Sequence, residues 1–437
     1  MRARLRTFLC LLTLVVTVST ASALQINPIL QSSSDGLTAN VTEQATSCSY
    51  DKNGLTPSMT PPSGCGPLNK SDWPQWRHDA GHSGYNPDER VVGPSNVGQL
   101  QMWWRMYTLG NSLFAVANGI LYGFGMDYYT GQQNLYAVRE TPGRPFLPVW
   151  MIPLDQFNDS CWADPLSRLT VDGGLVYLGC SSHSLYVIDA VTGVILDQTY
   201  IDYPFTVYKG DLYGSGQVET DTYVWGPTFF FELNHGQLGD CGPWGNIFCA
   251  AEGFASVDNG VALWNYSKLI VPIYQYRYGL LAMNVGEGSL AWYADGFSED
   301  GPEPVVANGV VYTVRDGYLY ALNAKNGQRL WSLPGLGKPI VSLTIAKASA
   351  MGYAACGQDG QDLCAFTLAT GKIMWTASGG GTPLAAANGV VYANGAFDAK
   401  TGKWLGSVTS GMVSGFVANG MVYVTDGGSI AAYGPRR

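Results

Sequence analysis

Charged residues are scarce in this sequence, and basic residues are scarcer than acidic ones. Only 13% of the 437 residues are charged, with 24 Lys and Arg against 33 Asp and Glu, so the net charge is -9. No run rich in Lys or Arg occurs beyond the N-terminal segment. Because a nucleic-acid-binding face must offset phosphate charge with basic side chains, this composition argues against a nucleic-acid-binding protein.

Motifs that mark common catalytic and cofactor sites are also missing. The sequence has no adjacent Cys-Cys pair, no C-x-x-C-H haem-attachment motif, no G-x-S-x-G elbow and no Gly-rich phosphate loop. His78 and His82 stand four residues apart, but the neighbouring Trp, Pro and Gly residues predict an extended lead-in rather than a metal-binding helix. We therefore predict no catalytic residue and no metal site.

The sequence has one notable apolar run, and it lies at the N-terminus. Residues 8–18 are apolar, follow a basic start and precede the small residues Ala21-Ser22-Ala23. This run is too short to span a membrane and is typical of a signal peptide. We predict that residues 1–23 are removed and that the mature protein is secreted to the extracellular space without a membrane anchor.

Cysteine usage fits an exported protein. Loss of Cys10 with the signal peptide leaves eight of the nine cysteines, and no C-x2-C metal spacing occurs among them. Eight cysteines allow 105 pairings, but local pairs close the shortest loops. The predicted disulfides are Cys48–Cys65, Cys161–Cys180, Cys241–Cys249 and Cys356–Cys364. The N-x-S/T sequons at Asn40, Asn69, Asn158 and Asn265 are compatible with glycosylation in a eukaryotic secretory route.

A hairpin phrase of the form V-x-N-G-x-V-Y recurs through the chain. Asn-Gly supplies the two positive-φ positions of a type I′ turn, and the β-branched and aromatic residues after it favour a buried strand. The mean step between copies is about 43 residues, the length of one propeller blade. Clear copies end at Tyr122, Tyr177, Tyr312, Tyr392 and Tyr423, and weaker copies end at Tyr213, Leu263 and Tyr353.

A second phrase completes each unit, and residues 321–331 show it most clearly. An Asn or Asp opens a turn, a Gly takes the left-handed position, and a Trp on the next strand covers the joint to the neighbouring blade. The two phrases predict an all-β chain of eight four-stranded antiparallel blades over residues 73–437. A Ser/Thr/Pro-rich leader precedes them at residues 24–72. The last unit lacks its outer strand, so we expect the strand at residues 97–105 to complete it.

This spacing, together with the lead-in W-P-Q-W-R-H-D-A-G-H-S-G-Y-N-P at residues 73–87, resembles the pyrroloquinoline-quinone-type, or quinoprotein alcohol dehydrogenase-like, propeller repeat family. The resemblance covers residues 73–433 and implies the fold. Its members include calcium-and-quinone alcohol dehydrogenases, an outer-membrane assembly scaffold lipoprotein and cofactor-free binding proteins. The dehydrogenases hold their quinone against an adjacent Cys-Cys disulfide, which this chain lacks. We therefore predict neither a quinone (PQQ) nor calcium.

One segment, residues 216–256, departs from the repeat. It combines many aromatic residues with the loop closed by Cys241 and Cys249, while the steps 122–177 and 213–263 are the longest between hairpins. Some of these aromatics are expected in core strands. The others predict a ligand-binding surface, because loops outside the repeat are free to carry recognition. The candidate ligand-binding residues are Trp244, Trp225, Tyr223, His235 and Asp240.

Together these patterns favour a monomeric, extracellular propeller that binds a protein or glycan without catalysis. The alternative is a secreted quinone-dependent oxidoreductase of the PQQ-type dehydrogenase kind. Fold and function are separate inferences here, because this fold carries both activities.

Overall fold

The computed structural model describes most of the chain from residue 68 to residue 436, all within the compact unit Ala45–Arg437. The predicted signal peptide, most of the predicted leader, and Cys48 and Cys65 lie outside the described residues. The other undescribed stretches are 109–113, 127–129, 141–147, 158–167, 181–183, 201–204, 210, 215–223, 226–227, 230–236, 239–246, 271–274, 286–289, 298–302, 335, 337–341 and 409–413.

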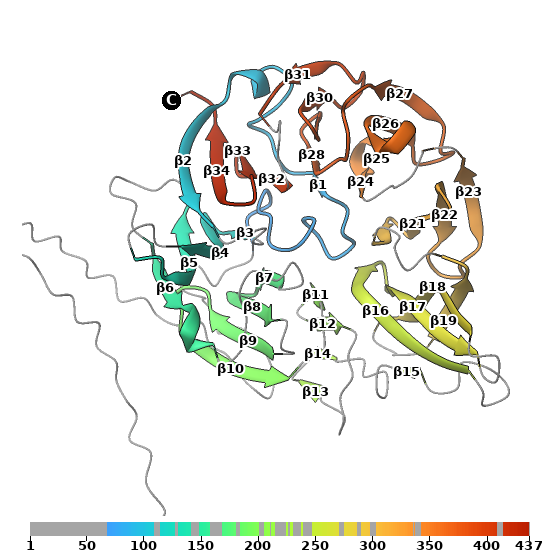
Figure 1. The fold of residues 1–437 in the computed structure, drawn as a ribbon, viewed down its shortest axis with the longest axis horizontal. Helices are drawn as coiled ribbons and strands as arrows, with labels where there is room; N and C mark the ends of the chain where they lie inside the picture. The colour runs from blue at the N-terminus through green and yellow to red at the C-terminus, as the bar shows by residue number, and fades with distance from the viewer. Residues whose placement is uncertain are drawn as a thin grey trace, which may run out of the picture. The chain divides into compact units, whose positions relative to one another are not determined.

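The described residues form small sheets, antiparallel except for one parallel pairing of Tyr85–Asn86 with Ala386–Ala387, and almost no helix, which confirms the all-β prediction. Within most sheets, strands that follow one another in the sequence are neighbours in space. Figure 1 shows these sheets standing around a common centre. The helical residues form short 3-10 turns: η1 (Val97–Gln99), η2 (Leu154–Gln156), η4 (Lys347–Ser349) and η5 (Gln358–Gly360).

Five of the described sheets have four strands. They contain β3 (Phe114–Ala117), β4 (Ile120–Met126), β5 (Gln133–Arg139) and β6 (Trp150–Pro153); β7 (Arg168–Asp172), β8 (Leu175–Cys180), β9 (Ser184–Asp189) and β10 (Ile195–Tyr200); β20 (Val305–Ala307), β21 (Val310–Arg315), β22 (Tyr318–Asn323) and β23 (Arg329–Leu333); β24 (Leu343–Ala346), β25 (Met351–Cys356), β26 (Asp362–Thr367) and β27 (Ile373–Ala377); and β32 (Ser414–Ala418), β33 (Met421–Thr425) and β34 (Ser429–Gly434) with β2 (Gln101–Tyr107).

The other described sheets depart from four strands. Two have a fifth strand: β28 (Ala385–Ala387), β29 (Val390–Tyr392), β30 (Ala396–Asp398) and β31 (Trp404–Gly406) with β1 (Tyr85–Asn86); and β16 (Ile247–Asp258), β17 (Val261–Ile270), β18 (Gln275–Asn284) and β19 (Leu290–Asp295) with β15 (Gln237–Leu238). Two have only two strands: β11 (Phe205–Tyr208) with β12 (Asp211–Gly214), and β13 (Val224–Trp225) with β14 (Thr228–Phe229).

The predicted hairpin turns are present. In the turn between β20 and β21, Asn308 and Gly309 have φ values of 53° and 73°, so both central residues are left-handed as a type I′ turn requires. The Asn-Gly pairs at 118–119, 259–260, 388–389 and 419–420 share this geometry. The tyrosines that end the phrases are buried on the second strand of their sheets, as Tyr353 and Tyr423 illustrate at 0% exposure.

The repeated Trp residues join each sheet to the next one. Trp292 on β19 donates its indole N–H to the carbonyl oxygen of Ala324 in the following sheet (2.7 Å), and its ring lies over Gly327, where a Cβ atom would come within 2.8 Å of it. This explains why the turn needs Gly. The same indole bond joins Trp150 to Ala190, Trp331 to Leu368, and Trp375 to Ala399.

A strand from the start of the folded region completes the sheet at the end of the chain. β2 runs antiparallel to β34, from Gln101 opposite Gly434 to Tyr107 opposite Ser429. The sequence predicted a strand at residues 97–105, but residues 97–99 form η1 and the strand continues to Tyr107. Trp104 on β2 donates its indole N–H to the Glu140 carbonyl oxygen (2.9 Å), so this sheet is joined to the first sheet by the repeated indole bond.

The Glu140 side chain also takes part in this junction. Its Oε1 accepts a hydrogen bond from the Tyr423 hydroxyl (2.6 Å) and its Oε2 accepts one from Asn419 Nδ2 (2.9 Å). The same Asn419 Nδ2 donates to Asp72 Oδ1 (2.8 Å), so one amide group joins two carboxyl groups. We call Asp72, Glu140, Asn419 and Tyr423 the seam cluster.

Residues 71–86, which we call the belt, contact the innermost strand of one sheet after another. Trp73 exchanges both backbone hydrogen bonds with Val116 on β3 (2.9 and 2.8 Å). The side-chain amide of Gln75 reproduces the pattern on β11, where its Nε2 donates to the Val207 carbonyl oxygen (3.1 Å). The other backbone bonds join Pro74 to Val171, Ala80 to Val257, Gly81 to Val306, Ser83 to Ile345, Gly84 to Ala386, and Ser71 to Asn419. In Figure 1 the belt is the blue segment that crosses the centre.

Close packing dictates the sequence of the belt. A Cβ atom at Gly81 would lie 2.1 Å from the Val306 carbonyl oxygen, so no larger residue fits between the belt and β20. Arg77 of the belt donates hydrogen bonds to the Leu343 carbonyl oxygen and the Thr344 hydroxyl on β24, and the His82 ring lies against Thr206 and Ser256. The belt therefore fixes a group of polar side chains against the inner strands.

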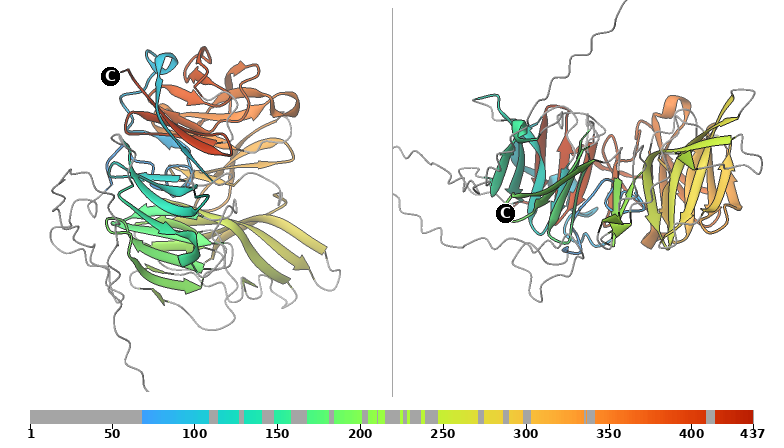
Figure 2. Two further views of the ribbon diagram at one scale, coloured as in Figure 1. Left: turned by 60° about the vertical axis from the view of Figure 1, so that its left-hand side comes forward. Right: turned by 90° about the horizontal axis from the view of Figure 1, so that it is seen from below.

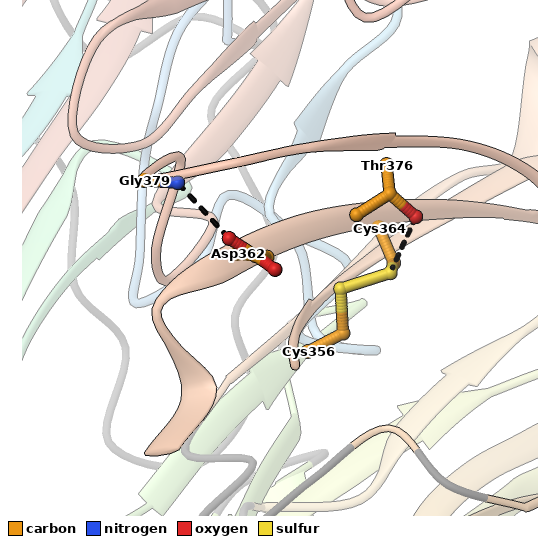
Figure 3. Close-up of a disulfide and its surroundings, with 5 residues drawn as sticks. All are labelled: Cys356, Asp362, Cys364, Thr376 and Gly379. Carbon is orange, nitrogen blue, oxygen red and sulfur yellow. Dashed lines mark hydrogen bonds between the residues drawn. A yellow bond between two sulfur atoms is a disulfide. The ribbon is translucent and has the colours of Figure 1, made fainter. Parts of the chain in front are cut away.

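The predicted disulfide Cys356–Cys364 is present and joins β25 to β26, with Cα atoms 5.8 Å apart (Figure 3). Cys364 Sγ lies 3.3 Å from the Thr376 hydroxyl oxygen, and Asp362 accepts a hydrogen bond from the backbone N–H of Gly379 (3.0 Å). Cys180 is also disulfide-bonded. The predicted pair Cys241 and Cys249 is not tested, because Cys241 lies outside them as well.

Candidate ligand-binding site

A cavity of about 380 Å³ lies between the belt and the inner strands. Its apolar side consists of Val171, Val207, Val257 and Val306, all buried, which we call the floor residues. Each belongs to an inner strand that is hydrogen-bonded to the belt. The remaining lining comes from Leu68, Asn69, Lys70, Asp72, Pro74, Gln75, His78, Asp79, Ala80, Gly81, Asp172, Tyr208, Lys209, Asp258 and Lys347.

Four charged residues, which we call the mouth residues, follow the inner strands closely. Asp172 ends β7, Lys209 follows β11, Asp258 ends β16 and Lys347 follows β24. They occupy hairpin turns or the starts of turns, where the chain leaves the buried sheet and polar side chains are favoured. The cavity therefore combines an apolar floor with charged groups of both signs.

Asp79 is the most strongly held carboxylate of the cavity. Its oxygens accept hydrogen bonds from the Ser83 backbone N–H (2.9 Å) and hydroxyl (2.8 Å), and Lys347 Nζ lies 3.6 Å away. Burial raises the pKa of Asp79, but the His78 ring, the Lys347 ammonium and the Ser83 N–H together outweigh burial and lower this pKa to about 2. Asp79 is therefore an anion at any physiological pH.

Asp258 is oriented by a neighbouring sheet. Its Oδ2 accepts hydrogen bonds from the Asn308 backbone N–H (2.9 Å) and from Asn259 Nδ2 (2.9 Å). Burial raises the pKa of Asp258, while the nearby Lys347 ammonium and the Asn308 N–H act in the opposite direction. Because backbone and amide donors fix its position, Asp258 presents a preorganised acceptor at the mouth of the cavity.

His78 contributes a buried polar atom to the cavity lining. Its ring packs edge-on against Trp73, with ring centroids 5.0 Å apart. Its Nδ1 is buried and has no hydrogen-bond partner, since the closest Asp79 oxygen is 3.9 Å away. Buried polar groups are normally hydrogen-bonded, so an unpaired ring nitrogen in a cavity wall is a mark of a site that a ligand or water completes.

His82 and Ser256 lie close together, but they are arranged for structure rather than catalysis. The Ser256 hydroxyl donates to the Pro304 carbonyl oxygen, so it accepts from His82 Nδ1 at 3.0 Å. His82 Nε2, 3.0 Å from the Thr206 hydroxyl, is then an acceptor. A nucleophilic serine needs the imidazole as its base, whereas here the imidazole donates to Ser256 and is 2% exposed.

The prediction of the ligand-binding residues is not tested by the described part of the chain. Tyr223, His235, Asp240 and Trp244 lie outside the described residues, and Trp225 belongs to β13. Of the predicted glycosylation sites, Asn69 is exposed beside the cavity, Asn265 lies on β17, and Asn40 and Asn158 are outside the described residues.

Sequence reasoning missed the cavity because its floor residues look like any other strand valines. The one available signal was the Asp that directly follows two of them, in Val171-Asp172 and Val257-Asp258. Nothing in the sequence places these pairs around one space. That information comes only from the path of the belt.

Comparison with known proteins supports the repeat architecture. The family described as outer membrane protein assembly factor BamB matches residues 219–434. The BamB protein of Bordetella pertussis is 34% identical over 93 residues, which cover 20% of this chain and 23% of that protein. This chain thus matches less than a quarter of that relative's length.

Solved structures extend the likeness over the folded region. The quinohemoprotein alcohol dehydrogenase of Comamonas testosteroni is similar with a TM-score of 0.57 at 14% identity, covering 84% of this chain and 81% of that chain. The quinohemoprotein alcohol dehydrogenase ADHIIG of Pseudomonas putida has a TM-score of 0.52 at 12% identity, covering 84% and 80%. The sequence match and the shared fold support PQQ-type propeller repeats in this chain. At such low identity, the two dehydrogenases establish the fold alone.

In this PQQ-type propeller, the described cavity does not fit a quinone or its calcium ion. A planar quinone needs flat faces on both sides, but the floor residues are branched aliphatic side chains, and the Tyr208 ring is already faced by Lys209 Nζ at 4.9 Å. Within the part of the chain that the structure describes, no three His, Cys, Asp or Glu residues are grouped to hold a metal. None of the helices described there has the length and apolar character to span a bilayer.

Proposed function

We propose that this chain is an exported propeller of eight blades that binds an extracellular protein or glycan and has no catalytic activity. The observation that carries the binding function is the unusual length of three adjacent strands. β16, β17 and β18 contain 12, 10 and 10 residues, whereas the strands of the four-stranded sheets contain 3 to 7.

The paired backbone of these strands continues beyond the buried residues that the structure describes. Their described buried residues end at Trp264 on β17 and begin again at Leu280 on β18, while the pairing continues outward to Ile270 opposite Gln275. Figure 2 shows β16–β18, in yellow, reaching beyond the neighbouring sheets. A hairpin that extends past the repeated core is where a propeller can add recognition without loss of its fold.

The backbone of this extension supports a protein partner in particular. β19 pairs with β18 only between Gly279 and Met283, so Gln275–Arg277 continue beyond the last β19 pairing. A strand edge of this kind can accept an extended segment of another chain. The segment 216–246, with the predicted binding residues Trp244, Tyr223, His235 and Asp240, precedes β16 directly in the sequence.

Eight blades and a closed ring are the finer fold that we propose. The belt contacts the inner strands β3, β7, β11, β16, β20, β24, β28 and β32 in turn, through hydrogen bonds of the backbone or of the Gln75 and Asn86 side chains. The β2 pairing with β34 would leave no open edge between the last blade and the first.

The names of the similar proteins also favour binding over redox chemistry. The matched family and the Bordetella relative carry the name of an assembly factor, which implies protein partners, and they match by sequence. The dehydrogenases match by fold alone. We propose export through the N-terminal signal, with a cell-surface or extracellular position.

The test shortens the hairpin by replacing residues 266–277 with an Asn-Gly turn. If the extension binds the partner, binding on a glycan array or in a pull-down from extracellular material is lost, while the melting temperature stays within a few degrees of wild type.

A matched pair of variants tests the contribution of one predicted binding residue. Trp244→Ala should weaken binding by about 2 kcal/mol if Trp244 is a hot spot, and Trp404→Ala, on the half-exposed Trp of β31, should leave binding unchanged.

The oxidoreductase alternative has a direct test. A quinone and calcium that bind only the native state at 100 times the dissociation constant would raise stability by about 2.7 kcal/mol. We expect neither this thermal shift nor dehydrogenase activity towards alcohols or sugars. A clear rise in melting temperature on addition of quinone and calcium would favour the oxidoreductase function over the binding function.

A further inference from the structure

The Asn-Gly turns that join inner strands to their neighbours share one backbone geometry. Both residues of each turn have left-handed φ values, at 118–119, 259–260, 308–309, 388–389 and 419–420. An Asn that precedes Gly is prone to deamidation, because no side chain hinders attack by the Gly backbone nitrogen on the Asn amide carbon. Ring closure needs the turn to leave its left-handed geometry, so the surroundings of each turn decide whether its Asn reacts.

Asn419 is firmly held at both of its reacting groups. Its Nδ2 donates to two carboxyl groups of the seam cluster, and its Oδ1 accepts a hydrogen bond from the Ser71 hydroxyl (2.6 Å). The attacking nitrogen of this turn is also engaged, since the Gly420 backbone N–H donates to Glu89 Oε2 (2.8 Å). This turn therefore serves as an internal reference for the others.

Most of the other Asn-Gly turns have a restraint of their own. Asn388 Nδ2 donates to the Val92 carbonyl oxygen (3.0 Å), and Asn259 Nδ2 donates to Asp258 Oδ2 (2.9 Å). Asn118 is half-buried. A bonded amide or a buried turn opposes the rotation that brings the amide carbon to the backbone nitrogen.

Asn-Gly pairs elsewhere in the described sheets are also restrained. The Gly327 N–H donates to the Asn323 carbonyl oxygen (2.9 Å), so the attacking nitrogen is engaged. Gly395 is buried, and the Nδ2 of Asn394 before it donates to the Gly379 carbonyl oxygen (3.3 Å).

Asn308 is the least restrained Asn in the described Asn-Gly turns. Its side chain is exposed, and its hydrogen bond to Asp258 Oδ2 (2.9 Å) is donated by the backbone N–H and not by the side-chain amide. A Cβ atom at Gly309 would meet nothing within 4 Å, so no neighbour blocks rotation of this turn. The Gly309 carbonyl oxygen accepts a hydrogen bond from the Ala324 N–H (2.9 Å), but this bond does not involve the Gly309 nitrogen.

We propose that Asn308 is a site of spontaneous deamidation. The Gly309 nitrogen bonds to the side-chain amide carbon of Asn308, the bond from this carbon to Nδ2 breaks, and Nδ2 leaves as ammonia with the proton that the Gly309 nitrogen loses. Water then adds to either carbonyl carbon of the resulting succinimide ring and gives aspartate or isoaspartate at this position. Water is the only co-reactant. The site does not depend on the macromolecular partner proposed above.

Both products alter the mouth of the cavity. Aspartate places a negative charge on the residue that is hydrogen-bonded to the Asp258 carboxylate. Isoaspartate adds a methylene group to the main chain, so the type I′ turn cannot keep its geometry. Either change weakens the bond from the Asn308 N–H that orients Asp258, and deamidation therefore changes an acceptor at the mouth without any enzyme.

The experiment ages the full protein in neutral buffer and follows each Asn-Gly site by peptide mapping and mass spectrometry, with a parallel sample unfolded in guanidinium chloride. Asn308 and Asn419 both lie in the tetrapeptide Val-Ala-Asn-Gly, so their local sequences match. In the folded protein we expect Asn308 to deamidate at least tenfold faster than Asn419, and in the unfolded protein we expect the two rates to converge. Equal rates in the folded protein, or a difference that persists on unfolding, would overturn the proposal.

A pair of variants tests the site by its change in charge. Isoelectric focusing of the aged wild type should show an acidic form of the protein. Asn308→Gln should remove most of this form, because Gln closes the larger ring far more slowly, whereas Asn326→Gln, at the restrained turn before Gly327, should leave it unchanged. Melting temperatures show whether both variants are folded. An acidic form that persists in folded Asn308→Gln would refute the assignment.

Discussion

Asp79 in the belt and Glu140 in the seam cluster are both carboxyl groups packed between the lead-in and the sheets, yet their pKa values move in opposite directions. Asp79 has a cation at 3.6 Å and two donors from Ser83, and its pKa is lowered to about 2. For Glu140 burial is the main cause, and the carboxylates of Asp72 and Glu89 add to it against the Tyr423 and Asn419 hydrogen bonds, so the pKa is raised to about 7.

The difference shows that hydrogen bonds alone do not keep a buried carboxyl group ionised here. Asp72 and Glu140 share one amide group of Asn419, and no cation is among the groups that shift the pKa of Glu140. Glu89 nearby accepts backbone hydrogen bonds from Val91, Val92 and Gly420. For Glu140 the two side-chain donors do not offset burial, so its pKa is raised.

The largest loss of stability is expected from removing the N-terminal lead-in, which contacts both the cavity around Asp79 and the seam cluster. A chain that starts after Met106 loses the belt and most of β2, and with them the partners of every inner strand and of β34. We expect insoluble or molten protein, judged by near-ultraviolet circular dichroism and by gel filtration. A truncated chain that melts like the full chain would show that neither region depends on the lead-in.

A smaller effect is expected from Glu140→Gln. The pKa of Glu140 rises from 4.5 to about 7 on folding, so the folded state holds the proton more tightly, and wild-type stability falls as the pH rises from about 4.5 to 7. The loss is about 3 kcal/mol at most by the linkage relation. The variant should lack this fall and exceed wild type in unfolding free energy at pH 8.

The measurement is urea unfolding between pH 4 and pH 8. Tyr423→Phe, which removes the hydroxyl donor to Glu140 Oε1 and keeps the ring stacked on Phe416, is the control, and it should retain the fall. If the unfolding free energies of wild type and Glu140→Gln changed with pH in parallel, the raised pKa of Glu140 would not be the cause of the fall.

The smallest effect, with the opposite sign, is expected from Asp79→Asn. The folded pKa of Asp79 is below its usual 3.8, so its contribution is present above pH 3.8 and is lost as the pH falls to about 2. The side chain is 26% exposed, which reduces the contribution to about 1–2 kcal/mol. The unfolding free energy of wild type should therefore fall more steeply between pH 4 and pH 2 than that of the variant. An identical dependence on pH in this range would refute the prediction.

Much of the fold could be predicted because its rules are local. Asn308-Gly309 sets a hairpin, and Gly327 leaves room for Trp292, within one unit or between adjacent units. The candidate site could not be predicted in the same way. Its geometry depends on contacts such as Gln75 with Val207 and Arg77 with Leu343, which no repeat pattern encodes.

The seam cluster was equally hidden from sequence analysis. Glu140 follows an ordinary strand, and its partner Asn419 is one of several Asn residues in identical turn motifs. The pairing of β2 with β34 and the contacts of the belt bring the first and last sheets together, and Asn419 there donates to two carboxyl groups. The mouth residues could be expected to be polar, but not to face one cavity.

The belt also has a consequence for the order of folding. Ser71 is bonded to Asn419, 348 residues further along the chain, and Asn86 to Val417. The belt is synthesised before all the strands that it contacts, yet it can complete its bonds only after the last of them exists. Contacts of such high sequence separation slow folding, so the final step during export should be the docking of the oldest part of the folded region.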